Sequence, residues 1–360
     1  MSKFWFYIFI VFSFLSLSCE NKPPQTGLYR EYYVTGQIRT EAYYKDGQLD
    51  GYFREYHENG RIKREGLYRK GEYYGLWKKY YPDGQLKYMI SNITPGETGE
   101  VREYYEDGTL KSQGTQLNTE LTGLMKRYYE TGELKRKENY QKGKLEGTVK
   151  EYYKSGTVKF EDFYKEGNNE GISKEFYPDG STQALRNYRD GQLDGVSREY
   201  YRNGEWKTVS NYKEGQLDGL TQEFYQDGSL KKRINYSMGK RLGVVKTFYP
   251  EGHLKGLGFY KGDQLEGPSK VYDESGQLLV EANFEDDQLA GISKEYDDDG
   301  NLKRTIEYSD GRRASIVTEY YANGFVKQES LYEYDVLKSK KFYDEKGQLI
   351  PQGQDENKEN

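Results

Sequence analysis

The sequence predicts an all-β protein: an elongated, single antiparallel β-sheet solenoid of tandem 24-residue β-hairpin repeats. The octet YKEGQLDG at 212–219 returns as YRDGQLDG at 188–195 and as YKDGQLDG at 44–51, at intervals that are multiples of 24 residues. Glycine recurs at the same 24-residue spacing from Gly27 to Gly291 without insertion or deletion. No segment has the apolar period of a helix, and glycine at this frequency would cost a helix roughly 1 kcal/mol each time.

The first segment, residues 1–19, is predicted to be a signal peptide. Lys3 precedes an apolar stretch that is too short for a spanning helix of roughly 20 residues and has the layout of a secretory signal. Its ending, LSLSC, resembles the lipobox of bacterial lipoproteins, which implies lipidation of Cys19 and a membrane-anchored protein in the periplasm or on the cell surface. An uncleaved signal anchor, or cleavage beside an incidental cysteine, is the alternative. Residues 20–26 then read as a tether.

Each repeat reads as strand, tight turn, strand, tight turn. In unit 195–218, GVSREYYRNGEWKTVSNYKEGQLD, the first turn carries Asn203-Gly204, a dipeptide that tolerates the positive φ of hairpin turns. Connections this short force neighbouring strands to be antiparallel. We expect thirteen such repeats over 27–338, a degenerate capping repeat at 339–350 and a disordered tail at 351–360.

The recurrent apolar positions are expected to form ladders along one face of the sheet. Arg198 and Glu199 are neighbours in sequence, so we expect them on opposite faces, as on a solvated surface. In unit 195–218 the recurrent apolar positions are Val196, Tyr200, Trp206, Tyr212 and Leu217.

Two adjacent repeats depart from this template. The aromatic residue and glycine expected near 92–96 give way to Asn92 and Pro95, and the next repeat has Gln116 and Asn118. These departures predict a bend or a loosened patch.

Composition excludes several classes of protein. Only 34% of residues are hydrophobic, but 16% are aromatic, mostly through 39 Tyr, which argues against disorder. Lys and Arg total 54 against 59 Asp and Glu, spread along the chain, so no nucleic-acid footprint is expected. Cys19 is the one cysteine, which excludes an intramolecular disulfide and a Cys/His metal site.

No catalytic constellation stands out, and we expect no enzyme activity, cofactor or metal. His57 and His253 each replace a template residue within a repeat. Carboxylates recur with the period, whereas an acid and base pair needs two different environments. Asp297, Asp298 and Asp299 precede a turn, but Ile306 stands where a calcium loop needs its bidentate glutamate.

The phrases Gly-Gln-Leu-Asp-Gly and Glu-Tyr-Tyr-x-x-Gly-x-Leu-Lys resemble the MORN repeat variant of bacterial proteins, including those grouped with the YwqK-type antitoxins. The resemblance covers about 27–350 and implies a meandering sheet of stacked hairpins. It also implies an interaction or scaffolding module, with membrane-lipid binding in some members.

We therefore expect a non-enzymatic, membrane-tethered lipoprotein that scaffolds a protein or an envelope component. One alternative is a glycan or peptidoglycan-binding module, with Tyr201, Tyr225 and Tyr249 as candidate ligand-contact aromatics, because tyrosine combines an apolar ring with a polar tip. A YwqK-type antitoxin is the other.

Overall fold

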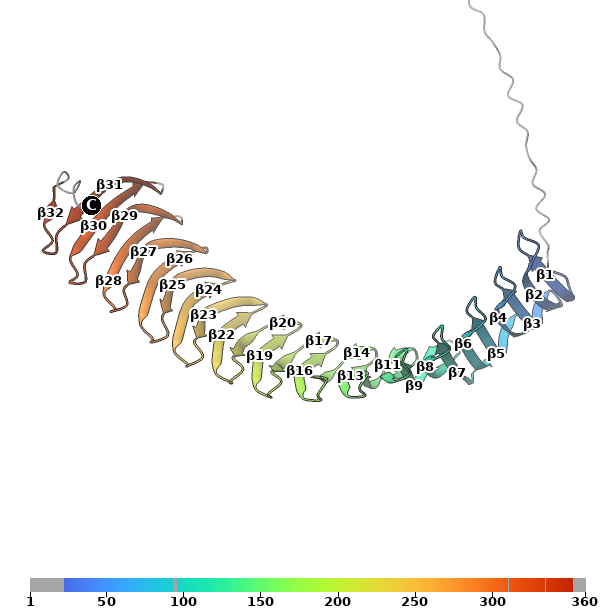
Figure 1. Ribbon diagram of the computed structural model, residues 1–360. Coiled ribbons are helices and arrows are strands. Elements are labelled where there is room, and N and C mark those ends of the chain that lie inside the picture. The colour runs from blue at the N-terminus through green and yellow to red at the C-terminus, as the bar shows by residue number, and fades with distance from the viewer. Residues whose placement is uncertain (1–22, 94–95, 119, 310, 334, 352–360) are drawn as a thin grey trace, which may run out of the picture. The chain divides into compact units, whose positions relative to one another are not determined.

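A computed structural model describes residues 23–93, 96–118, 120–309, 311–333 and 335–351, and these form strands and turns with no helix (Figure 1). The predicted signal peptide, Cys19 and nearly all of the predicted tail lie outside the described residues. Among the described residues, no helix has the length and apolar character needed to cross a membrane. The chain divides into two compact units, with the boundary between Gly132 and Glu133.

Unit 1 is an antiparallel meander in which each strand pairs with the strands before and after it in sequence. Its strands are β1 (Gly27–Tyr32), β2 (Ile38–Lys45), β3 (Gln48–Tyr56), β4 (Ile62–Arg69), β5 (Glu72–Tyr80), β6 (Leu86–Ile93), β7 (Thr98–Tyr104), β8 (Leu110–Leu117) and β9 (Glu120–Tyr128).

Unit 2 continues the same pattern, and in four repeats the second turn leads into a short strand that a bulge separates from the next long one. Its strands are β10 (Leu134–Gln141), β11 (Lys144–Leu145), β12 (Gly147–Tyr152), β13 (Val158–Lys165), β14 (Asn168–Asn169), β15 (Gly171–Phe176), β16 (Thr182–Arg189), β17 (Gln192–Leu193), β18 (Gly195–Tyr200), β19 (Trp206–Lys213), β20 (Gln216–Leu217), β21 (Gly219–Phe224), β22 (Leu230–Ser237), β23 (Lys240–Phe248), β24 (Leu254–Lys261), β25 (Gln264–Tyr272), β26 (Leu278–Glu285), β27 (Gln288–Tyr296), β28 (Leu302–Ser309), β29 (Arg312–Tyr320), β30 (Val326–Glu333), β31 (Val336–Tyr343) and β32 (Leu349–Ile350).

The predicted fold class, an all-β array of antiparallel hairpin repeats, is confirmed. The sheet is open rather than closed into a barrel, because β1 pairs only with β2 among the described strands and β32 only with β31. The residues predicted to cap the array, 339–350, form the end of β31 and all of β32.

The first turn of each repeat is a type I turn closed by glycine. In unit 195–218 the Gly204 amide donates to the Tyr201 carbonyl at 3.0 Å, and the Tyr201 amide donates to the Glu205 carbonyl at 2.8 Å. Gly204 has a φ of 90°, whereas Asn203 stays out of the left-handed region. Its side chain instead accepts a bond from the Glu205 amide at 3.2 Å, as Asn does in an Asx turn.

The second turn is where two consecutive residues adopt positive φ. Glu214 and Gly215 have φ of 50° and 80°, the pattern of a two-residue type I′ hairpin. The sequence predicts positive φ for the Asn-Gly dipeptide of the first turn, whereas in the structure only the glycine of that dipeptide has it.

The sheet has an inner face, which carries the buried residues, and an outer face. Ser197 pairs with Ser210 and Gly195 with Tyr212, so these residues share the inner face. Val196 pairs with Asn211 and lies on the outer face, because successive residues of a strand point to opposite sides. The expected single ladder of Val196 and Tyr212 is therefore wrong, whereas the expected separation of Arg198 from Glu199 is confirmed.

The core consists of inner-face residues from neighbouring repeats that complement each other in size. Ala42 on β2 pairs with Phe53 on β3, and Ile90 on β6 pairs with Val101 on β7, all four buried. Gly66 on β4 leaves room for the Trp77 indole: a Cβ at Gly66 would lie 2.3 Å from the ring. Next to the large side chains of Phe53 and Trp77, the adjacent repeat thus contributes the small residues Ala42 and Gly66.

Gly66→Ala should therefore destabilise unit 1 by about 1–3 kcal/mol, the usual cost of overpacking. The midpoint of urea unfolding, followed by far-UV circular dichroism, measures it. The Trp77→Val variant lacks the indole ring, so in that background Gly66→Ala should lower the free energy of unfolding hardly at all. A double-mutant cycle tests this difference. An equal cost in both backgrounds would contradict the proposed contact.

Candidate functional site

The three tyrosines singled out by sequence lie at the start of the first turn in successive repeats. Their rings are half-buried, and their hydroxyls donate to backbone carbonyls of the following repeat. The distances are 2.9 Å from Tyr201 to Phe224, 2.8 Å from Tyr225 to Phe248 and 3.0 Å from Tyr249 to Tyr272. These hydroxyls thus connect neighbouring hairpins.

The two histidines take structural places in the same pattern. His57 stands at the position of these tyrosines, and its Nε2 lies 3.2 Å from the Tyr80 carbonyl oxygen. His253 Nδ1 lies 2.6 Å from the Glu274 carbonyl oxygen.

The acidic turn at 297–299 is held by its own backbone. Asp297 Oδ1 accepts bonds from the amides of Asp299 at 3.1 Å and Asn301 at 2.8 Å. Among the described residues, no group of three or more His, Cys, Asp or Glu side chains is arranged to hold a metal ion.

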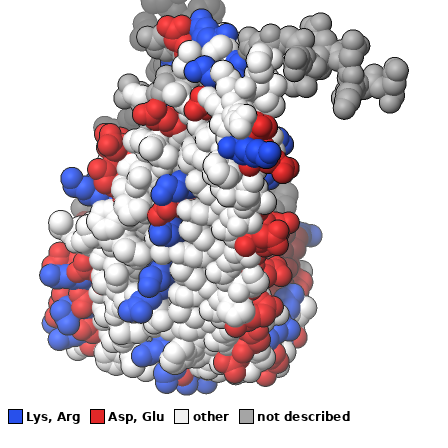
Figure 2. All heavy atoms as spheres, turned by 90° about the vertical axis from the view of Figure 1, so that its left-hand side faces the viewer, with Lys and Arg blue, Asp and Glu red and all other residues white. Residues whose placement is uncertain are grey.

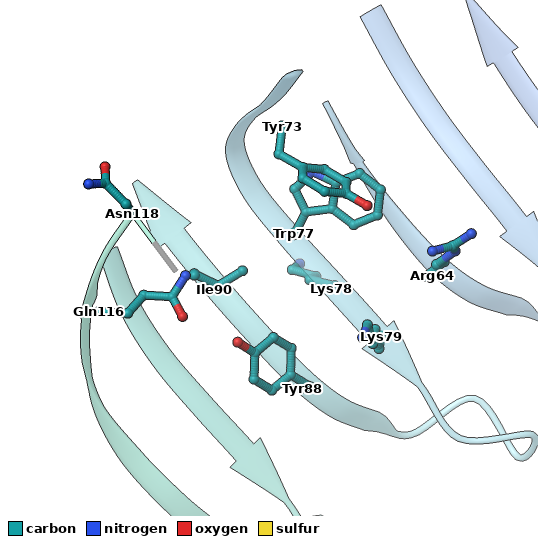
Figure 3. A pocket seen from close by; sticks show the side chains of 9 residues that line it. All are labelled: Arg64, Tyr73, Trp77, Lys78, Lys79, Tyr88, Ile90, Gln116 and Asn118. Carbon is teal, nitrogen blue, oxygen red and sulfur yellow. The ribbon is translucent and has the colours of Figure 1, made fainter. Parts of the chain in front are cut away.

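A hollow of about 230 Å³ opens on the inner face of unit 1 (Figure 3). In most repeats a tyrosine such as Tyr44 or Tyr68 covers this level of the inner face, next to a leucine such as Leu49. Position 116 carries Gln instead. The lost aromatic cover, predicted above to loosen the sheet, accounts for the hollow. It is lined by Arg64, Tyr73, Trp77, Lys78, Lys79, Tyr88, Ile90, Gln116 and Asn118.

Aromatic rings form one wall of this hollow. Trp77 is 5% exposed, and its indole N–H donates to the Leu67 carbonyl at 3.2 Å. Tyr73 packs edge-on against it, with ring centroids 4.4 Å apart, yet remains 46% exposed. Tyr68 meets both rings, so Tyr73 is held firmly while one part of its ring faces solvent.

Polar groups face the aromatic wall from β6, β8 and the residue that follows β8. In Figure 3 the Gln116 side chain extends toward Ile90, and the Tyr88 hydroxyl points toward Gln116. Within the described part of the chain, no hydrogen bond engages the side chain of Tyr88 or Gln116. Asn118 Oδ1 accepts from the Gly96 amide at 3.1 Å, which leaves its NH₂ group as a donor.

The charge of the hollow is positive, because Arg64 and Lys79 line it from the inner face; Lys78 borders it but lies between Trp77 and Lys79, at a strand position that points to the outer face. Lys79 pairs with Arg64 across β4 and β5, and its Nζ lies 5.7 Å from the centre of the Tyr88 ring. Burial raises the pKa of Tyr88, and the Glu103 carboxylate raises that pKa further, so the phenol keeps its proton and can donate.

Gln116 and Asn118 are visible in the sequence as departures from the repeat template, but the sequence alone does not predict this hollow. Tyr73, Trp77, Lys79 and Tyr88 come from other strands, and only the register of β4, β5 and β6 places them together. Two of these residues depart from the template in the sequence: Lys79 replaces the glutamate of most other repeats, and Tyr73 replaces the leucine.

The outer face carries a second recurrent feature, a row of exposed apolar pairs. Leu28 pairs with Tyr43 in unit 1, and Val244 pairs with Phe259 in unit 2. Cross-strand ion pairs lie beside them, as between Lys270 and Glu281 at 3.0 Å. Figure 2 shows, on the side of the molecule that it presents, basic and acidic side chains set in a largely uncharged surface.

The family model described as the MORN repeat variant matches more than half of the sequence. Residues 191–216 fall outside the matched segments, although β18 and β19 there form the same hairpin. The matched segments are 25–46, 49–70, 73–91, 97–118, 121–142, 145–166, 169–190, 217–238, 241–261, 265–286 and 289–310.

No curated protein matches the sequence. Among solved structures, a variant of the Tc holotoxin pore of Photorhabdus luminescens is similar at 12% sequence identity and a TM-score of 0.16. The match covers 89% of this chain and 21% of the toxin chain, so this chain spans about a fifth of that protein's length. A likeness at this score supports no conclusion about function.

Tyr225→Phe should lower stability by about 0.5–1.5 kcal/mol, the usual contribution of one hydrogen bond, because Phe248 loses its inter-repeat donor. Hydrogen exchange should show the loss of protection around Phe248. Tyr43→Phe, which removes a hydroxyl from an exposed outer-face ring, is the matched control. If both variants changed exchange equally, the hydroxyl contact would have no stabilising role.

Proposed function

The chain belongs to the MORN repeat variant family, and from this premise we propose that it is a non-enzymatic, membrane-tethered lipoprotein that scaffolds a protein of the cell envelope. MORN repeats suggest a protein-interaction module. The proposal adds an anchor, lipidated Cys19, and a docking surface, the outer face of unit 2.

The observation that carries the docking surface is the row of exposed apolar side chains on that face. Ile172, Ile292 and Ile316 are 55%, 52% and 45% exposed, and Ile316 pairs with Leu331, which is exposed as well. Scattered exposed apolar residues are ordinary, but here the same position of the repeat is apolar and exposed in several repeats of unit 2, which lines these side chains up along one face. Apolar groups within a polar rim are the usual anatomy of a protein interface.

The surroundings of the row suit a partner of mixed charge. Lys270 and Lys294 both lie within ion-pair distance of Glu281, at 3.0 and 3.9 Å. Such exposed pairs add little stability, and they give register and selectivity to a docked partner.

The docking proposal is tested with the double variant Ile292→Ser/Ile316→Ser. In-cell crosslinking, purification and quantitative mass spectrometry should recover the major partner at about a tenth of the wild-type amount, which corresponds to about 1.4 kcal/mol of binding energy. Val34→Ser removes a fully exposed apolar side chain from a turn instead and should leave recovery unchanged. Unchanged recovery with the double variant would rule out this face.

The anchor is tested by mass spectrometry of the N-terminal peptide from the membrane fraction of the native host. We expect an acylated Cys19, with loss of both the acyl group and membrane retention in Cys19→Ala. An intact Met1 in the soluble fraction would contradict the lipoprotein proposal and favour the antitoxin relationship.

A further inference from the structure

Departures from the repeat template converge on one place in unit 1. Lys79 stands where Glu31, Glu55 and Glu103 stand in the repeats around it, and Gln116 stands where most repeats have tyrosine. Both line the hollow described above, together with Tyr73, which replaces a leucine. Each change replaces the residue of the repeat template with a side chain that faces the hollow.

A second hollow, of about 640 Å³, adjoins the first and shares Arg64 and Lys79 with it. It extends toward the first-turn ends of β5 and β6 and includes Tyr80, Tyr81 and Lys87. We call the two together the basic groove. Its larger part alone falls within the roughly 300–1,000 Å³ of ligand sites.

The basic groove has a strong excess of positive charge, although the whole chain has a net charge of −5. Its acidic residue, Glu55, already binds Lys63 at 2.8 Å and also pairs with Arg64. Among the described residues, Lys79 and Lys87 have no carboxylate partner, and their ammonium groups lie over the rings of Tyr88 and Tyr81. The charged residues lining the groove are Glu55, Lys63, Arg64, Lys78, Lys79 and Lys87.

A ligand in the groove would meet side chains, because the backbone hydrogen-bonding groups of the strands around it are already paired with neighbouring strands. β4, β5 and β6 are each paired on both sides, so a peptide could not add a strand there. What remains is the partly exposed ring of Tyr73, the hydroxyl of Tyr88, the amides of Gln116 and Asn118, and two ammonium groups. Ring faces suit the apolar faces of sugars, and hydroxyl and amide groups match sugar hydroxyls.

We infer that the basic groove binds an acidic oligosaccharide, a chain of sugar rings that carry carboxylates. One sugar ring packs on Tyr73, hydroxyls of the rings that follow meet Tyr88 and Gln116, and a carboxylate of a following ring meets Lys79. The next rings run past Arg64 toward Lys87 and Tyr81. This site is on the inner face of unit 1 and does not rest on the docking surface proposed for the outer face of unit 2.

Isothermal titration calorimetry of the purified full-length chain in detergent tests the inference. The probe is tetragalacturonate at low salt, and its fully methyl-esterified form is the neutral counterpart. We expect saturable binding of the acid, binding of the ester weaker by about tenfold or more, and a loss of affinity as salt rises.

Two variants restore the template and should remove the site without disturbing the fold. Lys79→Glu reverses the central charge, and Gln116→Tyr refills the hollow, so each should weaken binding by about tenfold or more. The matched control is Arg127→Glu. Arg127 stands at the same repeat position as Lys79 but outside the groove, so this substitution also reverses a charge and restores the glutamate of the template. It should leave the affinity within about twofold, and circular dichroism establishes that all variants fold.

Several results would overturn the inference. No saturable binding of tetragalacturonate would exclude this ligand class, and equal binding of the ester would mean a site for neutral sugars. Equally tight binding of hexaglutamate, with the same response to Lys79→Glu, would identify an acidic-peptide site. An Arg127→Glu effect as large as that of Lys79→Glu would reduce the binding to unspecific charge attraction.

Discussion

Every hairpin of this protein can bury its inner side chains only against the hairpins before and after it, because one open sheet has no second layer to cover it. The size match between adjacent repeats follows from this constraint, as Gly66 beneath Trp77 and Ala42 beside Phe53 show. So do the tyrosine hydroxyls that reach the next repeat's carbonyl oxygens, as Tyr225 does at Phe248. Stability in such an array is a sum of local terms, with no central core to average them.

The sequence was sufficient for the strands and turns because these depend on glycine positions and period. It was insufficient for the burial pattern, since the core position is occupied by Phe53, Val149 or Ser197 in different repeats. Such a position shows no recurring residue type. The recurring Val196 position looks like a core and is on the outer face, where hydrophobic residues line up without being covered.

The candidate site was within reach of the sequence only in part. The absent tyrosine at position 116 was visible as a departure, and the structure shows its physical result, a hollow beside Trp77. The partners Tyr73 and Tyr88 could not be assigned, because cross-strand neighbours depend on the register between β4, β5 and β6. That register includes a shift between Gly75 and Trp77, which no pattern in the neighbouring sequence predicts.

The strictly sequential pairing within each unit also determines how the protein responds to mechanical force. A pull along the direction in which the strands succeed one another loads every ladder of backbone hydrogen bonds in series, so the tension is the same in each and the weakest yields first. The hairpins on either side of a yielded ladder keep their own neighbours and their folded state. An array of this kind lengthens in discrete steps, one hairpin at a time, and each step dissipates mechanical work while the remaining hairpins stay folded.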